Sequence, residues 1–239
     1  MAGSERNLRA IAVVPAYNEQ DTVASVVDEI KRTVPDVDVV VVDDGSVDDT
    51  FSRAVGAGAK VIRHIFNMGI GAAVQTGFRF AANNGYDVAI QVDADGQHDP
   101  KYIPLMLKII KEKRADVVSG SRFIEGKGFQ SSVVRRIGIK FFQMLYRILL
   151  GIRVTDCTSG FRAFANDALR FIAQNYPDDY PEPEAIVLIH KAKFRLVEIP
   201  VVMRNRQGGS TSISGLKPLQ YMVKVTLALL MDLLRKVER

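Results

Sequence analysis

The fold is decided by residues 88–100, which read VAIQVDADGQHDP. Five residues of strand character, Val88–Val92, run directly into the carboxylates of Asp93 and Asp95. In an extended segment, a spacing of two residues places both side chains on one face. Two convergent carboxylates suit a hard divalent cation such as Mg²⁺ or Mn²⁺, which favours oxygen ligands and keeps positions for substrate phosphates. The stretch predicts a strand that ends at a site for a metal-bound diphosphate, although a solvated acidic turn also fits its Asp-Gly pair.

The residues around this stretch alternate between strand and helix patterns. Apolar runs at residues 10–14 and 37–42 and a weaker strand pattern at 60–62 precede the strand at 88–92, and a helix pattern follows each of the four. In the first helix, Val23, Val26 and Ile30 recur at helical spacing, with Asp21 or a neighbour as the expected N-cap. Four alternations predict an α/β fold built on an open, mostly parallel sheet flanked by helices.

Polar clusters follow all four predicted strands, at residues 15–19, 43–46, 67–71 and 93–97. Ligands of such sheets bind beyond the carboxyl ends of the strands, so these clusters predict a nucleotide site. A dinucleotide-binding oxidoreductase would carry its glycine fingerprint after the first strand, where this chain has Pro-Ala-Tyr-Asn-Glu. The P-loop pattern is also missing, so redox and P-loop classes are disfavoured.

The composition is that of a globular, basic protein. The 239 residues are 47% hydrophobic and carry a formal charge of +5, which suits nucleic acid, an anionic membrane or a phosphate-bearing substrate. The single cysteine, Cys157, excludes an internal disulfide and favours a reducing compartment. Residues 1–9 show no signal-peptide pattern, and no apolar stretch has the length of a membrane-spanning helix.

The second half contains two amphipathic helix patterns. In residues 133–150 an apolar stripe that includes Phe141 and Leu145 runs beside Arg136, Lys140 and Arg147. Such a helix can lie in a membrane interface, or it can pack on the sheet or on a second subunit. The final helix, expected at about 216–237, reads as an interfacial or interaction helix. We therefore expect a catalytic domain over residues 1–212 and a C-terminal amphipathic helix over 213–239.

Five segments in this order resemble a family 2 inverting glycosyltransferase with the GT-A fold, of the dolichyl-phosphate mannosyltransferase type. The segments are Pro15–Glu19, Val42–Ser46, Asn67–Gly71, Asp93–His98 and Thr158–Arg162, and the similarity spans roughly residues 10–210. The resemblance implies an enzyme that transfers a hexosyl or N-acetylhexosaminyl group from a UDP- or GDP-sugar to a polyprenyl phosphate. It also implies Mg²⁺ or Mn²⁺ as cofactor.

The resemblance further assigns residues to roles. Asp93, Asp95 and Gln97 would hold the metal, and Asp95, Asp156 and Arg162 would be the catalytic residues. The acceptor phosphate would be bound by Arg122, Arg136, Ser159 and Arg162. The nucleotide sugar would be held by Pro15, Tyr17, Asn18, Glu19, Asp43, Asp44, Gly71, Asp93, Ala94, Asp95, Arg204 and Arg206. The lysine that usually follows the serine of the Arg204–Ser210 segment is replaced by Thr211, which puts that phosphate contact in doubt.

Several alternatives remain open. A sugar hydroxyl acceptor would require a carboxylate base, for which Asp156, Glu182 and Glu184 are candidates. A nucleotidyltransferase could use the same aspartates, and a non-catalytic nucleotide-sugar-binding module could keep the same motifs. We expect a cytoplasmic protein that is peripheral on the cytoplasmic face of the membrane, with a small membrane-protein partner or a homo-oligomer as possible assemblies. No nucleic-acid partner is expected, because phosphate and membrane contacts explain the positive charge better.

Overall fold

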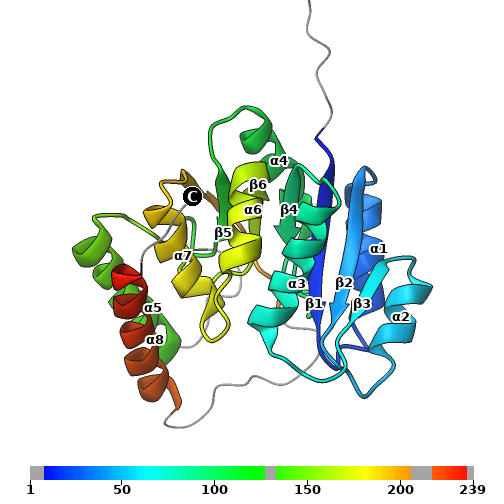
Figure 1. Cartoon of the computed structure of the whole chain (residues 1–239), viewed down its shortest axis with the longest axis horizontal. Helices are drawn as coiled ribbons and strands as arrows, with labels where there is room; N and C mark the ends of the chain where they lie inside the picture. The colour runs from blue at the N-terminus through cyan, green and yellow to red at the C-terminus, as the bar shows by residue number, and fades with distance from the viewer. Residues whose placement is uncertain (1–7, 127–132, 206–216, 236–239) are drawn as a thin grey trace, which may run out of the picture.

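A seven-stranded sheet forms the centre of the protein (Figure 1). The computed structural model describes residues 8–126, 133–205 and 217–235. The strands lie in the order β3-β2-β1-β4-β6-β5-β7. Their bounds are β1 Ala10–Ala16, β2 Val37–Asp43, β3 Lys60–Arg63, β4 Val88–Gln91, β5 Val117–Ser121, β6 Arg162–Ala165 and β7 Leu196–Pro200.

The sheet is mostly parallel, as predicted, with one reversed strand. Strands β1 to β4 pair in parallel, and β5 pairs in parallel with β7. Strand β6 lies between β4 and β5 and is antiparallel to both. Arg162, the last residue of the Thr158–Arg162 segment, is the first residue of β6. Because β6 is reversed, its first residue lies at the edge where β4 ends.

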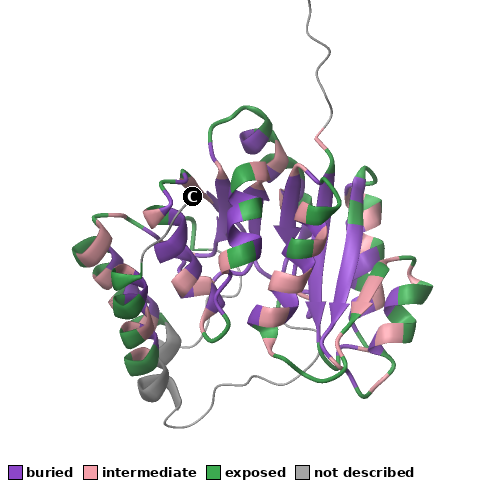
Figure 2. Cartoon of the chain, viewed as in Figure 1, coloured by how far each residue is buried: buried purple, intermediate pink, exposed green. Residues whose placement is uncertain are grey.

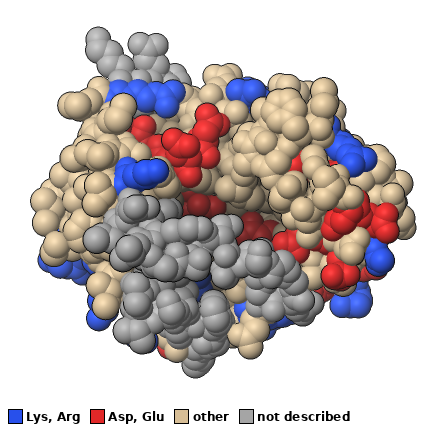
Figure 3. Space-filling view, turned by 90° about the horizontal axis from the view of Figure 1, so that it is seen from below, with Lys and Arg blue, Asp and Glu red and all other residues tan. Residues whose placement is uncertain are grey.

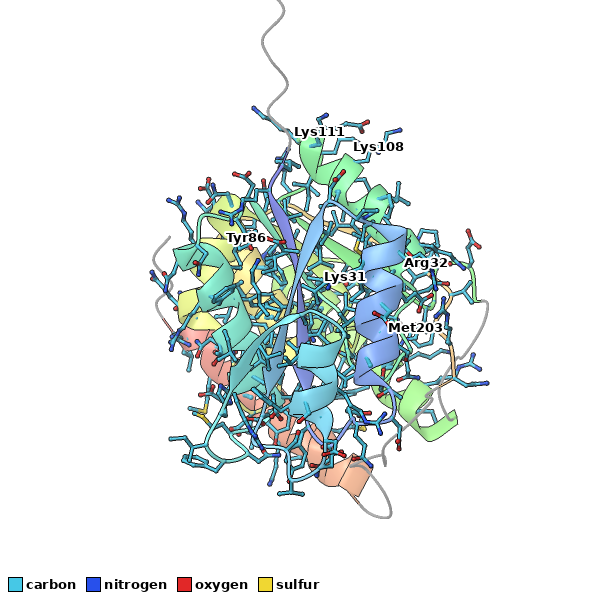
Figure 4. The ribbon with its side chains drawn as sticks, turned by 90° about the vertical axis from the view of Figure 1, so that its right-hand side faces the viewer. Lys31, Arg32, Tyr86, Lys108, Lys111 and Met203 are labelled. Atoms are coloured by element: carbon cyan, nitrogen blue, oxygen red, sulfur yellow. The ribbon has the colours of Figure 1, made fainter. Side chains whose placement is uncertain are left out.

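Helices cover both faces of the sheet. Their bounds are α1 Val23–Thr33, α2 Thr50–Gly56, α3 Ile70–Asn83, α4 Ile103–Lys111 after a 3₁₀ turn at Pro100–Tyr102, α5 Val133–Leu150, α6 Asn166–Asn175, α7 Pro181–Lys191 and α8 Lys217–Leu234. The N-cap expected at Asp21 or a neighbour falls on Thr22, whose hydroxyl donates to the Glu19 carboxylate and makes no cap bond to the helix. In Figure 4, Lys31 of α1 lies beside α2, and its Nζ donates to the carbonyls of Ala57 and Gly58 at 2.9 and 2.6 Å.

The alternation of β1 divides the core into two layers, and the whole strand is buried (Figure 2). Its even-numbered residues pack with α1 and α4, whereas Ile11 and Val13 pack with α3 and α6. The second layer is tight, because a Cβ added at Gly77 of α3 would lie 2.1 Å from Val13 Cγ1. Two apolar faces on each strand explain why the parallel strands read as continuous hydrophobic runs.

A third apolar cluster joins α5, α7 and α8 beside the sheet. Its buried side chains include Phe142 and Tyr146 of α5, Ile186 of α7 and Leu229 of α8. The Tyr146 hydroxyl donates to the Pro183 carbonyl at 2.9 Å, which ties α5 to α7. Within the described part of the chain, no helix has both the length and the apolarity needed to cross a membrane.

Candidate active site

The turns that follow β1 and β2 are bonded to each other. Asn18 has a φ of +54° and donates its backbone N–H to Ser46 Oγ at 2.9 Å. Its side-chain oxygen accepts from the Val47 N–H at 3.0 Å, and the Glu19 N–H donates to Thr50 Oγ1 at 2.8 Å. The structure therefore brings together two of the segments predicted to hold the nucleotide. Of the other residues in these segments, Tyr17 is exposed and Pro15 is buried.

The two aspartates after β2 organise the surrounding loops. Asp43 accepts from the Ser46 N–H at 3.0 Å, and its second oxygen lies 3.1 Å from Arg63 Nε. Asp44 accepts from the N–H groups of Met68 and Gly69 at 2.9 and 2.8 Å, and it contacts His64 Nδ1 at 2.7 Å. Asp44 thus fixes the loop that leads into α3, and a nucleoside contact by either aspartate stays a prediction.

Gly71 allows a close contact between two loops. It lies in the first turn of α3, where an added Cβ would be 2.5 Å from the Pro177 carbonyl oxygen. The glycine lets α3 approach the turn at Pro177 and Asp178. This packing gives position 71 a structural reason to be glycine, and its contact with the nucleotide stays a prediction.

Asp93 and Asp95 lie just beyond the end of β4. Sheet pairing stops at Gln91, and residues 94 and 95 form a turn completed by Gly96 with a φ of +75°. The expectation that the carboxylates share the face of an extended strand is therefore wrong, because the strand ends before them. Asp95 is buried and accepts from the Gln97 N–H at 3.0 Å, whereas the side chain of Asp93 is 35% exposed.

His98 supports this turn from inside the protein. Its Nδ1 accepts from the Asp93 N–H at 3.0 Å, which makes Nε2 the protonated nitrogen of the neutral ring. The ring is buried and stacks on Phe161 at a centroid distance of 4.9 Å. The other ring nitrogen lies 3.6 Å from Asp93 Oδ2. His98 therefore holds the backbone of the Asp93–Gly96 turn.

The donor set at this turn fits a hard cation that takes further ligands from its substrate. The described residues contain no group of three or more His, Cys, Asp or Glu side chains able to enclose a metal by themselves. Asp93 and Asp95 supply carboxylate oxygens, and a diphosphate would complete the oxygen set. The Gln97 amide nitrogen donates to the Arg204 carbonyl at 3.2 Å, so only its side-chain oxygen is of ligand type.

Arg122 and Asp156 form a buried ion pair at the other side of the edge. Arg122 Nε and Nη2 donate to the two Asp156 oxygens at 2.7 and 2.8 Å. Thr158 also donates to Asp156, and Glu198 accepts from the Thr155 and Asp156 N–H groups at 2.7 and 2.9 Å. Burial raises the pKa of the Glu198 carboxyl. Both oxygens of Asp156 are engaged, and this pairing argues against its predicted catalytic role, which stays a prediction. The contact of Arg122 with the acceptor phosphate also stays a prediction.

Arg162 and Ser159 present polar groups that the described residues leave unsatisfied. Arg162 is 1% exposed, and its Nη1 donates to the Glu182 carbonyl at 2.9 Å. Within the described ranges, Arg162 Nε and Nη2 and the buried Ser159 Oγ have no hydrogen-bond partner. Gly160, between them, packs on Asp93: a Cβ there would lie 3.4 Å from both Asp93 oxygens. Buried donors without partners indicate a site for an anionic ligand.

The remaining predicted arginines lie elsewhere. Arg204 binds both oxygens of Glu29 at 2.8 Å and lies 3.0 Å from Asp99, so its guanidinium is already paired. Its contact with the donor stays a prediction. Arg136 is exposed on α5, and Arg206 lies outside the described residues. Figure 3, which views the carboxyl ends of the strands, shows acidic atoms at the floor of a hollow with basic residues near its rim.

Sequence reasoning missed two side chains of this site. Gln91 is 1% exposed and its amide nitrogen donates to Asp93 Oδ1 at 3.2 Å. The hydroxyl of buried Tyr176 donates to Gln91 Oε1 at 3.1 Å. A polar residue inside the apolar run VAIQV was the available signal for Gln91. Tyr176 follows α6, and no local pattern relates it to β4.

Comparison with known proteins identifies relatives over most of the chain. Residues 11–172 match the model of Glycosyl transferase family 2. The undecaprenyl-phosphate mannosyltransferase of Micrococcus luteus is 33% identical, over 87% of this chain and 88% of that protein. The UDP-N-acetylglucosamine–dolichyl-phosphate N-acetylglucosaminyltransferase of Methanococcus voltae is 31% identical, over 79% and 83% of the two chains.

Solved structures agree on the fold. Glucosyl-3-phosphoglycerate synthase from Mycobacterium tuberculosis, in complex with Mn²⁺, UDP and glucosyl-3-phosphoglycerate, superimposes with a TM-score of 0.72 at 21% identity. The match covers 98% of this chain and 82% of that one, and it confirms the predicted GT-A architecture. The family match and the two curated relatives confirm the resemblance seen in the sequence: this chain is a glycosyltransferase and belongs to glycosyl transferase family 2.

Proposed function

We propose that this glycosyltransferase moves a sugar from a nucleoside diphosphate sugar to a polyprenyl phosphate, with inversion at the anomeric carbon. The observation that carries the proposal is the buried Arg162, whose Nε and Nη2 have no hydrogen-bond partner among the described residues. In the sequence, Ser159 and Arg162 flank Gly160, which packs on Asp93, and a phosphate bound there would complete their donors. The names of the Micrococcus luteus and Methanococcus voltae relatives support a polyprenyl-type phosphate as the acceptor.

The chemistry suits the groups that are present. A phosphate acceptor is already an anion near neutral pH, so it requires positioning more than a general base. Arg162 and Ser159 would orient its oxygen toward the anomeric carbon, whose bond to the diphosphate breaks as the new bond forms. Asp93 and Asp95, with the side-chain oxygen of Gln97, would hold Mg²⁺ or Mn²⁺. When bound, the cation screens the charge of the departing diphosphate.

No observation favours a sugar hydroxyl as the acceptor. Asp156 is bound by Arg122 through both carboxylate oxygens, and Glu184 is paired with Asp232 of α8. The third candidate base, Glu182, contacts Arg162 through its backbone carbonyl, which accepts from Nη1. The lipid-phosphate acceptor therefore accounts better for the buried donors of Arg162.

We further propose that the protein is peripheral on the cytoplasmic face of a membrane. Helices α5 and α8 expose apolar side chains that include Ile137, Ile148 and Leu227. Arg136, Lys140 and Arg147 of α5 are exposed cations, which suit anionic headgroups. The buried free thiol of Cys157 is compatible with a reducing compartment. A membrane-protein partner or a homo-oligomer stays a prediction.

A transfer assay tests the proposal. Radiolabelled UDP- and GDP-sugars would be incubated with polyprenyl phosphate in detergent, with Mn²⁺ or with EDTA. We expect label in the organic phase only with metal, and an Asp95→Asn variant should lose at least about 100-fold in rate while keeping its circular dichroism spectrum. Release of pyrophosphate would instead identify a nucleotidyltransferase, and label confined to water-soluble saccharide would identify a hydroxyl acceptor.

A further inference from the structure

A chain of buried polar side chains runs from α6 to the end of β4. The Tyr176 hydroxyl donates to Gln91 Oε1 at 3.1 Å, and Gln91 Nε2 donates to Asp93 Oδ1 at 3.2 Å. Tyr176 is 5% exposed and Gln91 is 1% exposed, so the polar groups of both side chains are shielded from bulk water. Of the three, only Asp93 reaches the surface of the hollow, with 35% of its side chain exposed.

The order of donors fixes the Gln91 amide in one orientation. A phenol is the donor toward the amide oxygen, which leaves the amide N–H₂ to face the carboxylate. Burial raises the pKa of Tyr176 well above its ordinary value, so the hydroxyl remains a donor at any physiological pH. A flipped amide would place its oxygen against the Asp93 carboxylate, which electrostatics disfavours.

Packing holds both side chains in place. The Tyr176 ring meets Phe78 of α3 edge to face, at a centroid distance of 5.3 Å. On the opposite side of the Gln91 amide, a Cβ added at Gly160 would be 2.6 Å from Gln91 Nε2. The amide is therefore enclosed between the core and the segment that leads into β6. Carboxylates that bind cations are oriented by such partners, whose loss weakens binding about 10- to 100-fold.

We propose that Gln91 and Tyr176 are positioning residues for Asp93: they hold one carboxylate oxygen so that the other is presented to the cation on the donor diphosphate. The inference rests on the proposed role of Asp93 in holding that cation. Neither residue touches the hollow directly, so both act through Asp93.

The test measures cation binding directly. The dissociation constant of Mn²⁺ would be determined by the electron paramagnetic resonance signal of free Mn²⁺, with UDP or GDP at saturation. We expect Gln91→Met to weaken binding about tenfold or more and Tyr176→Phe to weaken it by a smaller factor. Under steady-state conditions, extra Mn²⁺ should restore much of the lost rate, because the variants lose affinity for the cation and keep the reacting groups.

Tyr86→Phe provides the matched control. Tyr86 is 3% exposed and its hydroxyl also donates to an aspartate, Asp38, but it precedes β4 at the opposite end of the strand. In Figure 4 it lies away from the carboxyl ends of the strands. We expect the same Mn²⁺ affinity as in the wild type, with a loss of melting temperature similar to that of Tyr176→Phe.

The outcomes separate this inference from the proposed function. Wild-type Mn²⁺ affinity in both Gln91→Met and Tyr176→Phe would overturn the positioning role while leaving Asp93 in place. If Gln91→Met fails to fold, Tyr176→Phe alone decides, since it removes only one oxygen atom. A wild-type protein that binds the nucleotide but no Mn²⁺ would overturn the cation role of Asp93, and this inference with it.

Discussion

At the scale of single residues, the buried guanidinium of Arg162 is the most informative group in the protein. A charged side chain that is 1% exposed normally has all of its donors paired, yet Nε and Nη2 of Arg162 have no hydrogen-bond partner in the described residues. Such a group costs folding free energy in the absence of a ligand. Its retention is understandable where binding an anion is the function of the site.

Replacing Arg162 should separate stability from activity. In Arg162→Met we expect the ligand-free unfolding free energy to stay equal to that of the wild type or to rise by about 1–2 kcal/mol, because a buried, incompletely paired charge is removed. The transfer rate should fall at least about 100-fold. Urea unfolding and the transfer assay measure the two quantities. Arg79→Met is the control: Arg79 also donates to a backbone carbonyl, that of Ala173 at 3.0 Å, but it is exposed. A large loss of stability in Arg162→Met, but not in Arg79→Met, would contradict the inference that the Arg162 guanidinium destabilises the ligand-free fold.

At this scale the sequence predicts the carboxylates of the site but few of their partners. Asp93 and Asp95 stand out because they follow an apolar run that must be a strand. The pairing of Arg122 with Asp156, and of Arg204 with Glu29, joins residues 34 and 175 positions apart. Such contacts depend on how the elements pack, so no local pattern indicates them.

At the scale of elements, α8 is attached to the domain through two polar contacts with α7. Lys191 Nζ donates to the Asp232 and Leu233 carbonyls at 2.6 and 2.7 Å, which caps the end of α8. The carboxyl groups of Glu184 and Asp232 are in direct contact. The Tyr180 N–H and the Asp179 carboxylate face Glu184. The cations of Lys191 and Arg235 face Asp232. Burial, and then Asp232, raise the pKa of Glu184 to about 7. Glu184 is therefore partly protonated near neutral pH.

This pair predicts a pH dependence of stability. The carboxyl of Glu184 has an ordinary pKa of 4.5 and a folded pKa of about 7, so the folded state binds the proton more tightly and loses stability as pH rises from about 4.5 to 7. Glutamine mimics the protonated form. Between pH 5 and 8 the unfolding free energy of the wild type should fall by about 1–2 kcal/mol more than that of Glu184→Gln, a reduced figure because Glu184 is half-buried. Parallel pH profiles for the two proteins would refute the raised pKa of Glu184.

The elements themselves were largely predictable, with β6 as the exception. The buried strands β1 and β2 are short, mostly apolar runs rich in valine, and α5 has an apolar stripe at helical spacing, so composition, length and spacing identify them. Strand β6 has only four residues, begins with an arginine and is followed at once by α6. Its strand conformation comes from pairing with β4 and β5, which is tertiary information.

At the scale of the whole molecule, the cations are spread over opposite ends. Lys108 and Lys111 of α4 lie at the end away from the carboxyl edge of the sheet (Figure 4), whereas Lys140 and Arg147 lie on α5 beside exposed Ile137 and Ile148. Net charge alone would attract either end to an anionic surface. Exposed apolar side chains that can enter the interface are more extensive beside the cations of α5, where Ile137, Met144 and Ile148 are exposed, than on α4, where Leu105 is exposed.

This difference predicts an orientation on membranes. Binding to anionic phospholipid vesicles would be measured by sedimentation at low salt. The double variant Lys140→Glu/Arg147→Glu should have a partition coefficient about tenfold or more below that of the wild type. Lys108→Glu/Lys111→Glu changes the net charge equally and should have a much smaller effect. Equal losses in the two double variants would mean that only net charge matters. Binding of the wild type should weaken as salt is raised.

The reversed strand β6 also has a consequence for how the enzyme is made. Its partners β4 and β5 both precede it in the chain, and it carries Arg162 as its first residue. During synthesis the half of the sheet from β1 to β4 can therefore assemble before Arg162, which we propose to bind the acceptor phosphate, has been added. A nascent chain that has not emerged as far as residue 160 can hold neither β6 nor the contact of Gly160 with Asp93. With the role proposed for Arg162, incomplete chains lack the transfer site and are expected not to transfer the activated sugar.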